Sequence, residues 1–184
     1  PFHLPVGIAQ GSLSKRGLRG KHLLIFVCTG SRGYQFNRLI EEVDRLAAAG
    51  EMGDEVFAQI GDSAPPKHIA FERYIDKERF TRLQREADLI ISHAGTGALI
   101  SALKLGKQVI AVPRLAEFSE AIDNHQTQIA EVLAAKGYLR QVTAIADLGR
   151  VIRQCTEEPL IKVYAIESRI IGLIEAFLDD NRVG

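Results

Sequence analysis

The sequence predicts an α/β fold, a Rossmann-like parallel sheet with helices on both faces. The apolar run at residues 89–91 is followed by the small-residue loop Ser-His-Ala-Gly-Thr-Gly and then by a helical pattern over residues 98–105. A second unit follows at once, because residues 108–112 form an apolar run closed by Pro113, and a helical segment at 126–135 comes after a loop. Strand, loop and helix in this alternation are typical of parallel sheets.

The chain before this stretch repeats the same alternation. Residues 22–27 are apolar enough for a central strand, 28–33 form a turn of small residues, and 35–49 have a helical pattern. Residues 55–60 and 69–74 are short strand candidates, because Pro65 and Pro66 exclude a helix between them.

A charged surface helix is predicted at residues 76–86. The spacing of Phe80 and Leu83 directs them to the core, and Arg79, Arg82 and Arg85 then face solvent. After the central stretch we expect one more strand at 138–142 and a helix at 146–155.

Residues 160–178 predict a helix that is apolar nearly all round. Such a helix is either deeply buried or docked on another protein, and both interpretations remain open. We therefore divide the chain into an irregular basic arm at 1–21, a Rossmann-like domain at 22–158 and a C-terminal helix at 159–184.

Composition is that of an ordinary globular protein, with 184 residues, 46% hydrophobic residues and no net charge. The first 40 residues nevertheless contain no acidic residue. The arm would suit an anionic membrane surface or a partner, or it is a solvated extension. Cys28 and Cys155 provide no disulfide framework and no metal spacing, and no apolar run is as long as a membrane span, so we expect a cytoplasmic protein.

The loop at 92–97 has the chemistry of a phosphate site. Gly95 and Gly97 let the backbone come close to a ligand at a helix start, Ser92 and Thr96 add hydroxyl groups, and His93 adds an imidazole. The alternative is a glycine-rich turn that only links strand to helix.

The second loop ends in Asn124, His125 and Gln126, which offer amides and an imidazole to a polar ligand. The alternative is that Asn124 is the N-cap of the next helix and the other two are solvated. Both loops follow strands of one parallel sheet, so they are predicted to face a common crevice where ligands bind.

Three segments in this order and spacing resemble the C-terminal domain of glycosyltransferase family 28: ISHAGTG, LGKQVIAVPR and DNHQTQIAEVLAAKGYL. Within the family the pattern is similar to the catalytic subunits of two-part UDP-sugar transferases, as in the eukaryotic dolichol-linked GlcNAc transferase and the bacterial exopolysaccharide enzymes. The VPR followed by a long loop and DNHQ is more similar to the bacterial exopolysaccharide branch. The resemblance covers residues 22–142.

This resemblance implies one half of a GT-B enzyme that transfers a sugar, with inversion, from a UDP-sugar to a lipid-linked saccharide. The acceptor would be bound by a separate membrane-associated subunit, which would recruit this chain to the cytoplasmic face of a membrane. No tightly bound cofactor, no metal and no nucleic acid is implied, and no DxD-like pair of acidic residues stands beside the loops. The donor-binding residues implied are Thr29, Gly30, Ser31, Ser92, His93, Gly95, Thr96, Gly97, Pro113, Arg114, Asn124, His125 and Gln126.

His93 is the candidate catalytic residue on this chain, although it would equally orient the phosphates while the partner supplies the base. Two residues depart from the family pattern: Cys28 stands where a loop glycine is expected, and Ser101 replaces a glutamate that holds the donor ribose. A noncatalytic UDP-sugar-binding or scaffold module, and a nucleotide-sugar epimerase-like enzyme, are therefore the alternatives.

Overall fold

The computed structural model describes residues 22–161 and contains one six-stranded sheet in which every pairing is parallel. The strand order is β3-β2-β1-β4-β5-β6, so the chain builds one half of the sheet outward from β1 and then crosses back to build the other half. This is the order of a dinucleotide-binding Rossmann fold. The predicted fold class is confirmed.

The strands are short and largely apolar, and the four central ones have both faces covered by helices. Their bounds are Leu24–Cys28 (β1), Glu55–Gln59 (β2), Ala70–Glu72 (β3), Leu89–Ser92 (β4), Gln108–Ala111 (β5) and Arg140–Gln141 (β6). The two edge strands β3 and β6 are shorter than the predicted runs at 69–74 and 138–142, because each pairs on one side only.

Five α-helices and two short 3-10 turns connect the strands within the described residues. The α-helices are Asn37–Ala48 (α1), Lys77–Glu86 (α2), Thr96–Lys104 (α3), His125–Ala135 (α4) and Leu148–Glu157 (α5). The 3-10 turns are Ala116–Phe118 (η1) and Ile145–Asp147 (η2). The helical segment predicted from residue 146 thus begins as η2 and becomes α-helical at Leu148.

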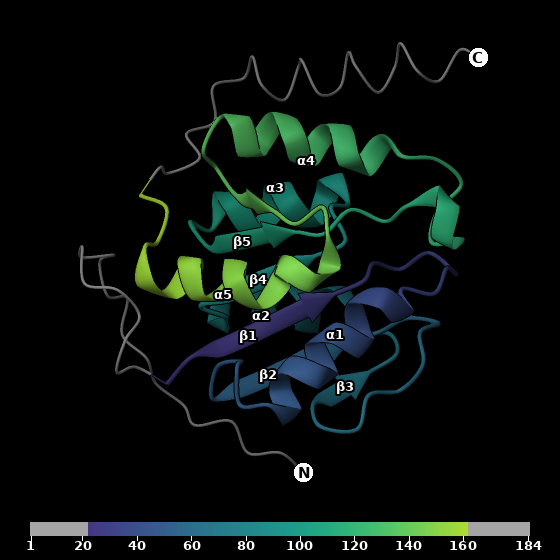
Figure 1. Ribbon diagram of the computed structural model, residues 1–184, viewed down its shortest axis with the longest axis horizontal. Coiled ribbons are helices and arrows are strands. Elements are labelled where there is room, and N and C mark those ends of the chain that lie inside the picture. The colour runs from purple at the N-terminus through teal and green to yellow at the C-terminus, as the bar shows by residue number, and fades with distance from the viewer. Residues whose placement is uncertain (1–21, 162–184) are drawn as a thin grey trace.

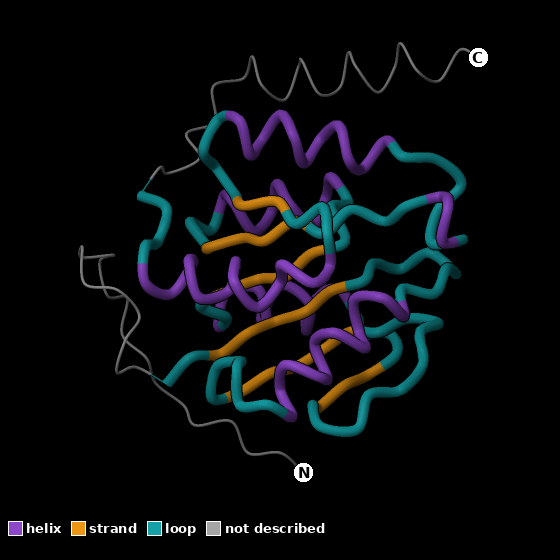
Figure 2. Tube along the Cα trace, in the orientation of Figure 1, coloured by secondary structure: helices purple, strands orange, loops and turns teal. Residues whose placement is uncertain are grey.

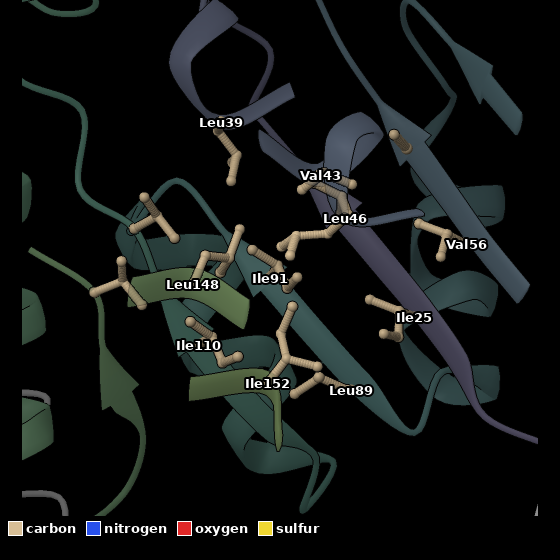
Figure 3. Packing of buried hydrophobic residues seen from close by; sticks show 14 of the residues in the cluster. Ile25, Leu39, Val43, Leu46, Val56, Leu89, Ile91, Ile110, Leu148 and Ile152 are labelled. Atoms are coloured by element: carbon tan, nitrogen blue, oxygen red, sulfur yellow. The ribbon is translucent and has the colours of Figure 1, made fainter. Parts of the chain in front are cut away.

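The helices form two layers, one on each face of the sheet. Helices α1 and α5 lie in front of the strands in Figure 1, and α2 and α3 lie behind them; Figure 2 separates helices, strands and loops along the same trace. Figure 3 shows the front core, where Leu39 and Leu46 of α1 and Ile152 of α5 meet strand residues such as Ile91 and Ile110. The rear core joins α2, α3 and α4 to the other faces of the same strands.

Helix α2 agrees with its predicted pattern. Asp76 caps the helix by accepting a hydrogen bond from the backbone N–H of Arg79 at 2.8 Å, and Leu83 is buried as expected. Phe80 packs edge-on against Phe26 of β1. The side chain of Arg79 is 36% exposed, and its guanidinium also pairs with Glu72 and lies over the ring of Phe57, so it is less free than a solvated arginine.

The last described residues are attached to the amino end of β5. The side chain of Gln108 donates to the carbonyl of Leu160 and accepts from its N–H, both at 2.9 Å. Leu160 and Ile161 are not helical, so the predicted C-terminal helix does not begin at Leu160. The rest of that prediction, and the basic arm, concern residues outside the described range. Within that range no helix is long and apolar enough to span a bilayer.

Candidate functional site

The loops that follow β1, β4 and β5 begin beside one another at one edge of the sheet. The strand register pairs Cys28 with Ser92 and Ser92 with Ala111, which are the last residues of the three strands. The ladder continues into the loops, since the N–H of His93 donates to the carbonyl of Cys28 at 3.0 Å. We call this edge the carboxyl edge. It brings together the loops that contain the predicted site residues.

His93 lies against two glycines at the carboxyl edge. A Cβ atom on Gly30 would lie 2.6 Å from Nε2 of His93, and a Cβ atom on Gly95 would lie 2.2 Å from the same nitrogen. Gly30 also has a φ of +88°. Any larger residue would displace the imidazole, so the loops after β1 and β4 meet through this ring.

His93 is held as a neutral imidazole. Its Nδ1 lies 3.2 Å from the carbonyl oxygen of Cys28, which can only accept, so Nδ1 carries the proton and Nε2 has the free lone pair. Burial, and secondly the charge of Arg114, lower the pKa of His93 to about 4. At neutral pH the ring therefore presents a hydrogen-bond acceptor and no charge.

The predicted hydroxyl groups divide into two buried and two accessible ones. Ser92 is fully buried beside the thiol of Cys28, and Thr29 is fully buried with its Oγ1 donating to the carbonyl of Gln59 at 3.0 Å. Ser31 is exposed and Thr96 is half-buried. Only Ser31 and Thr96 are thus placed to reach a ligand with their hydroxyls.

Helix α3 starts at the carboxyl edge without a side-chain cap. Gly95 is its N-cap, and the N–H of Leu99 is the first to bond back, to the carbonyl of Gly95 at 3.0 Å. The amides of the preceding turn have no acceptor inside the helix. Gly97 is exposed, and nothing lies within 4 Å of the position of a Cβ there. Free amides and the positive end of the helix dipole make this turn suited to an anion.

The predicted polar residues at the start of α4 shape the loop after β5. Oδ1 of Asn124 accepts from the N–H of Ala116 at 3.0 Å, and Oε1 of Gln126 accepts from the N–H of Arg114 at 3.2 Å. Asn124 is the N-cap residue of α4, as the alternative interpretation has it, but its side chain makes no cap hydrogen bond. The amide NH₂ groups of both side chains remain for a ligand.

The imidazole of His125 pairs with the residue just before Asn124. Its Nδ1 lies 2.7 Å from Oδ1 of Asp123, and its backbone N–H donates to the same oxygen. The hydrogen bonds from His125 lower the pKa of Asp123. Residues 123–126 therefore form a bonded turn.

A buried ion pair connects the loop after β5 to helix α1. Arg38 binds both carboxylate oxygens of Glu120, at 3.0 and 2.9 Å, and donates to the carbonyl of Pro113 at 3.0 Å. Arg114 donates to the carbonyls of Thr29 and Glu120. Sequence reasoning missed Glu120 and Arg38. The sequence carries no local signal that distinguishes Glu120 from Glu117 in the same loop, and its partner lies 82 positions earlier.

The two departures from the family pattern are placed as follows. Cys28 is the last residue of β1 and is fully buried, and the loop glycine with positive φ is Gly30. Cys28 is therefore a core residue, and the glycine requirement is met two positions later. The hydroxyl of Ser101 donates to Oε1 of Gln84 on α2 at 2.8 Å, so it is engaged between helices.

An open hollow of about 570 Å³ lies along α1 and η1. Its lining is Gln35, Asn37, Arg38, Glu41, Glu42, Arg45, Phe118, Glu120 and Ile145. It contains none of the glycine amides and none of the predicted site residues. We place the candidate site at the carboxyl edge instead, because the free amides and the loop glycines are there.

Comparison with known proteins gives relatives of one kind. The chain is 28% identical over 144 residues to the UDP-N-acetylglucosamine transferase subunit ALG13 of Kluyveromyces lactis, a match that covers 78% of this chain and 62% of that protein. It is 47% identical over 53 residues to the subunit of the same name from Yarrowia lipolytica, covering 29% of this chain and 25% of the relative. The chain thus spans less than two thirds of the length of these curated relatives.

Solved structures show the same fold at low sequence identity. An NMR structure of ALG13 superposes with a TM-score of 0.56 and 20% identity, covering 86% of this chain and 96% of that one. MurG from Acinetobacter baumannii gives a TM-score of 0.54 and 22% identity, with 89% and 54% covered. UDP-GlcNAc 2-epimerase from Neisseria meningitidis gives 0.56 and 14%, with 88% and 45% covered.

The family model of the glycosyltransferase family 28 C-terminal domain matches residues 24–168, which is most of the chain. The matched range contains β1 to α5 and every loop of the carboxyl edge. The chain belongs to glycosyltransferase family 28, as its C-terminal domain.

Proposed function

We propose that this chain is the donor-binding half of an inverting glycosyltransferase. It binds a UDP-sugar at the carboxyl edge and acts with a membrane-associated subunit that binds a lipid-linked saccharide acceptor, in the synthesis of a polysaccharide or glycan. The observation that carries the proposal is the uncapped start of α3 at Thr96, which opens beside the glycine-bounded His93. Free backbone amides at a helix start suit the diphosphate of such a donor.

The relatives support the same substrate class. The curated relatives described above are named as subunits of a UDP-N-acetylglucosamine transferase, and the epimerase structure of the same fold is bound to UDP-GlcNAc. A subunit name implies a second chain. A two-part enzyme that binds the donor on this chain and the acceptor on the partner is consistent with the subunit name and with the UDP-sugar ligand.

His93 is better suited to donor binding than to proton transfer. A general base works best when its pKa lies near the working pH, and that of His93 is lowered to about 4. Because Nδ1 carries the proton, the lone pair of Nε2 is available to accept a hydrogen bond from a hydroxyl of the UDP-sugar. The base that removes the proton from the acceptor hydroxyl is then supplied by the partner.

The transfer step needs charge stabilisation on the leaving UDP. The acceptor oxygen attacks the anomeric carbon from the side opposite the diphosphate, and the electron pair of the broken bond goes to the diphosphate oxygen. The amides of the first turn of α3 and the hydroxyl of Thr96 would stabilise that oxygen. The amide groups of Asn124 and Gln126 would contact the donor from the loop after β5.

Calorimetric titration of the full chain tests the proposal. We expect UDP and at least one of UDP-GlcNAc, UDP-glucose and UDP-galactose to bind, and ADP to bind at least tenfold more weakly, a difference of about 1.4 kcal/mol. His93→Ala should weaken binding. His68→Ala, which removes an exposed histidine paired with Asp44, is the matched control and should bind as wild type. A folded chain that binds none of these nucleotides would contradict the proposal.

A noncatalytic UDP-sugar-binding module is the second candidate. It is favoured by Ser101, whose hydroxyl is taken up by Gln84 and which leaves the ribose without the expected carboxylate. Assay of sugar transfer by membranes that contain the partner, with and without added chain, separates the two. Binding without any gain in transfer would favour the module. An epimerase-like activity would appear as UDP-sugar isomerisation by the chain alone.

A further inference from the structure

Two arginines and one glutamate form a cluster behind the loops of the carboxyl edge: Arg38, Arg114 and Glu120, which we call the arginine–glutamate cluster. The carboxylate of Glu120 is fully used, because Arg38 binds both its oxygens and the N–H of Leu115 donates to Oε2 at 3.0 Å. Its side chain is only 1% exposed. One positive charge and one negative charge are thus matched.

Arg114 is the member of the cluster without a carboxylate of its own. It is 2% exposed, and its two terminal nitrogens donate to backbone carbonyls, at 2.5 Å to Thr29 and 3.1 Å to Glu120. Its Nε is buried and has no hydrogen-bond partner among the described residues. Carbonyl groups are dipoles and do not cancel a charge, so two guanidinium groups and one carboxylate leave the cluster with one positive charge in excess.

The ring of Phe36 lies near both cations. The guanidinium carbons of Arg38 and Arg114 lie 5.3 and 5.4 Å from its centroid. Phe36 and Arg114 are buried, whereas the side chain of Arg38 is 15% exposed. An uncompensated buried charge costs free energy, and such a cost is retained where the charge has a use.

The excess charge acts on the carboxyl edge. Arg114 is bonded to Thr29, at the start of the loop after β1, and after burial its charge is the next cause of the lowered pKa of His93. Burial lowers the pKa of Arg114 itself, while the charges of Glu120, Tyr74 and Asp62 favour its charged form and that of Arg32 opposes it. The cation is therefore coupled to the groups that surround the start of α3.

We propose that Arg114 supplies the positive charge that makes the carboxyl edge selective for a nucleoside diphosphate, and that Glu120 and Arg38 are positioning residues that hold it there. The carboxylate of Glu120 pairs with Arg38, so the charge of Arg114 remains available to attract the ligand. This inference rests on the proposed function, because it names how the same site recognises the anionic part of its donor. Arg114 would act on the ligand by long-range electrostatic attraction, from its buried position behind the loops.

The test compares UDP with uridine, which has the same base and ribose but no phosphate. Titrations monitored by NMR would measure both affinities for wild type, Arg114→Met and Arg114→Lys. We expect Arg114→Met to weaken UDP binding about tenfold while uridine binding changes less than about twofold, and Arg114→Lys to recover part of the loss. Arg82→Met, which removes an exposed arginine of α2, is the control for net charge and should bind UDP as wild type.

Glu120→Gln gives a prediction of opposite sign. The amide keeps one acceptor oxygen but has no negative charge, so the net charge of the cluster rises by one. UDP should then bind more tightly, with a steeper dependence on salt. Equal loss of UDP and uridine binding in Arg114→Met would show a structural role only, and unchanged UDP binding would show no role; either result overturns the inference while the proposed function stands. Absence of UDP binding by wild type would overturn both.

Discussion

A Cβ atom on Gly95 would lie 2.2 Å from Nε2 of His93, closer than any real contact of that kind. With the imidazole in this position, residue 95 has to be a glycine. The same ring requires a glycine at position 30, on the loop after β1. The spacing of the loops after β1 and β4 therefore depends on the imidazole of His93 and on the absence of side chains at Gly30 and Gly95.

Replacement of Gly95 by alanine should destabilise the unliganded fold by about 1–3 kcal/mol, because the ring has to move out of a packed site. Thermal denaturation measures the change. Gly97→Ala is the matched control, since its Cβ meets nothing within 4 Å, and alanine inside a helix should be neutral or slightly stabilising. Equal melting temperatures for the two variants would be inconsistent with the packing described.

The neutral state of His93 predicts how stability depends on pH. Its pKa is lowered from 6.5 to about 4 on folding, so between these values the unfolded chain binds more protons than the folded one. The stabilising contribution of the neutral imidazole is complete above pH 6.5 and is lost as the pH falls toward 4. The Cε1–H resonance of His93 should therefore not shift between pH 8 and pH 5.5. A midpoint near 6.5 would contradict this.

The same linkage can be measured by denaturation. Between pH 7 and pH 4.5 the wild type should lose more stability than a His93→Gln variant, by up to about 2–3 kcal/mol. Identical pH profiles for the two proteins would mean that the imidazole titrates alike in the folded and unfolded states.

The pair of Arg38 and Glu120 should behave as a buried ion pair. Glu120→Ala leaves the buried guanidinium of Arg114 and the partly buried one of Arg38 without this carboxylate and should cost about 3–5 kcal/mol, whereas replacing both Arg38 and Glu120 by apolar residues should cost less. Chemical denaturation of both single variants and the double variant measures the coupling. The exposed pair of Arg45 and Glu42 provides the control, where Arg45→Ala should change stability little.

Asn124 offers a variant that separates loop structure from ligand binding. Asn124→Asp keeps the oxygen that accepts from the N–H of Ala116, so the melting temperature should stay close to wild type. It removes the NH₂ group and adds a negative charge, so UDP should bind several-fold more weakly. Asn124→Ala should lose both. Wild-type affinity in the aspartate variant would exclude a donor contact through this amide.

Much of the fold and part of the site could be predicted from local patterns. The four central strands were predicted within two residues because they are short apolar runs bounded by turns. The start of α3 was predicted two residues late, because Thr96 and Gly97 have poor helix propensity. The helix nevertheless begins at Thr96 and includes both residues. The turn predicted at 28–33 begins one residue later, because Cys28 is the last residue of β1, and a strand end and a loop start look alike without a register.

The sequence by itself determined which segments are strands and helices, where the glycine-rich turns fall, and which polar groups follow the strands, because these depend on residues close in the chain. Only the tertiary structure decided which of those groups meet. Arg114 reaches Thr29 across 85 residues and Glu120 reaches Arg38 across 82, and both contacts exist because β4 places the loops after β1 and β5 on either side of it. The protonation of His93 was decided in the same way, since a pKa depends on burial and on charges brought near by folding.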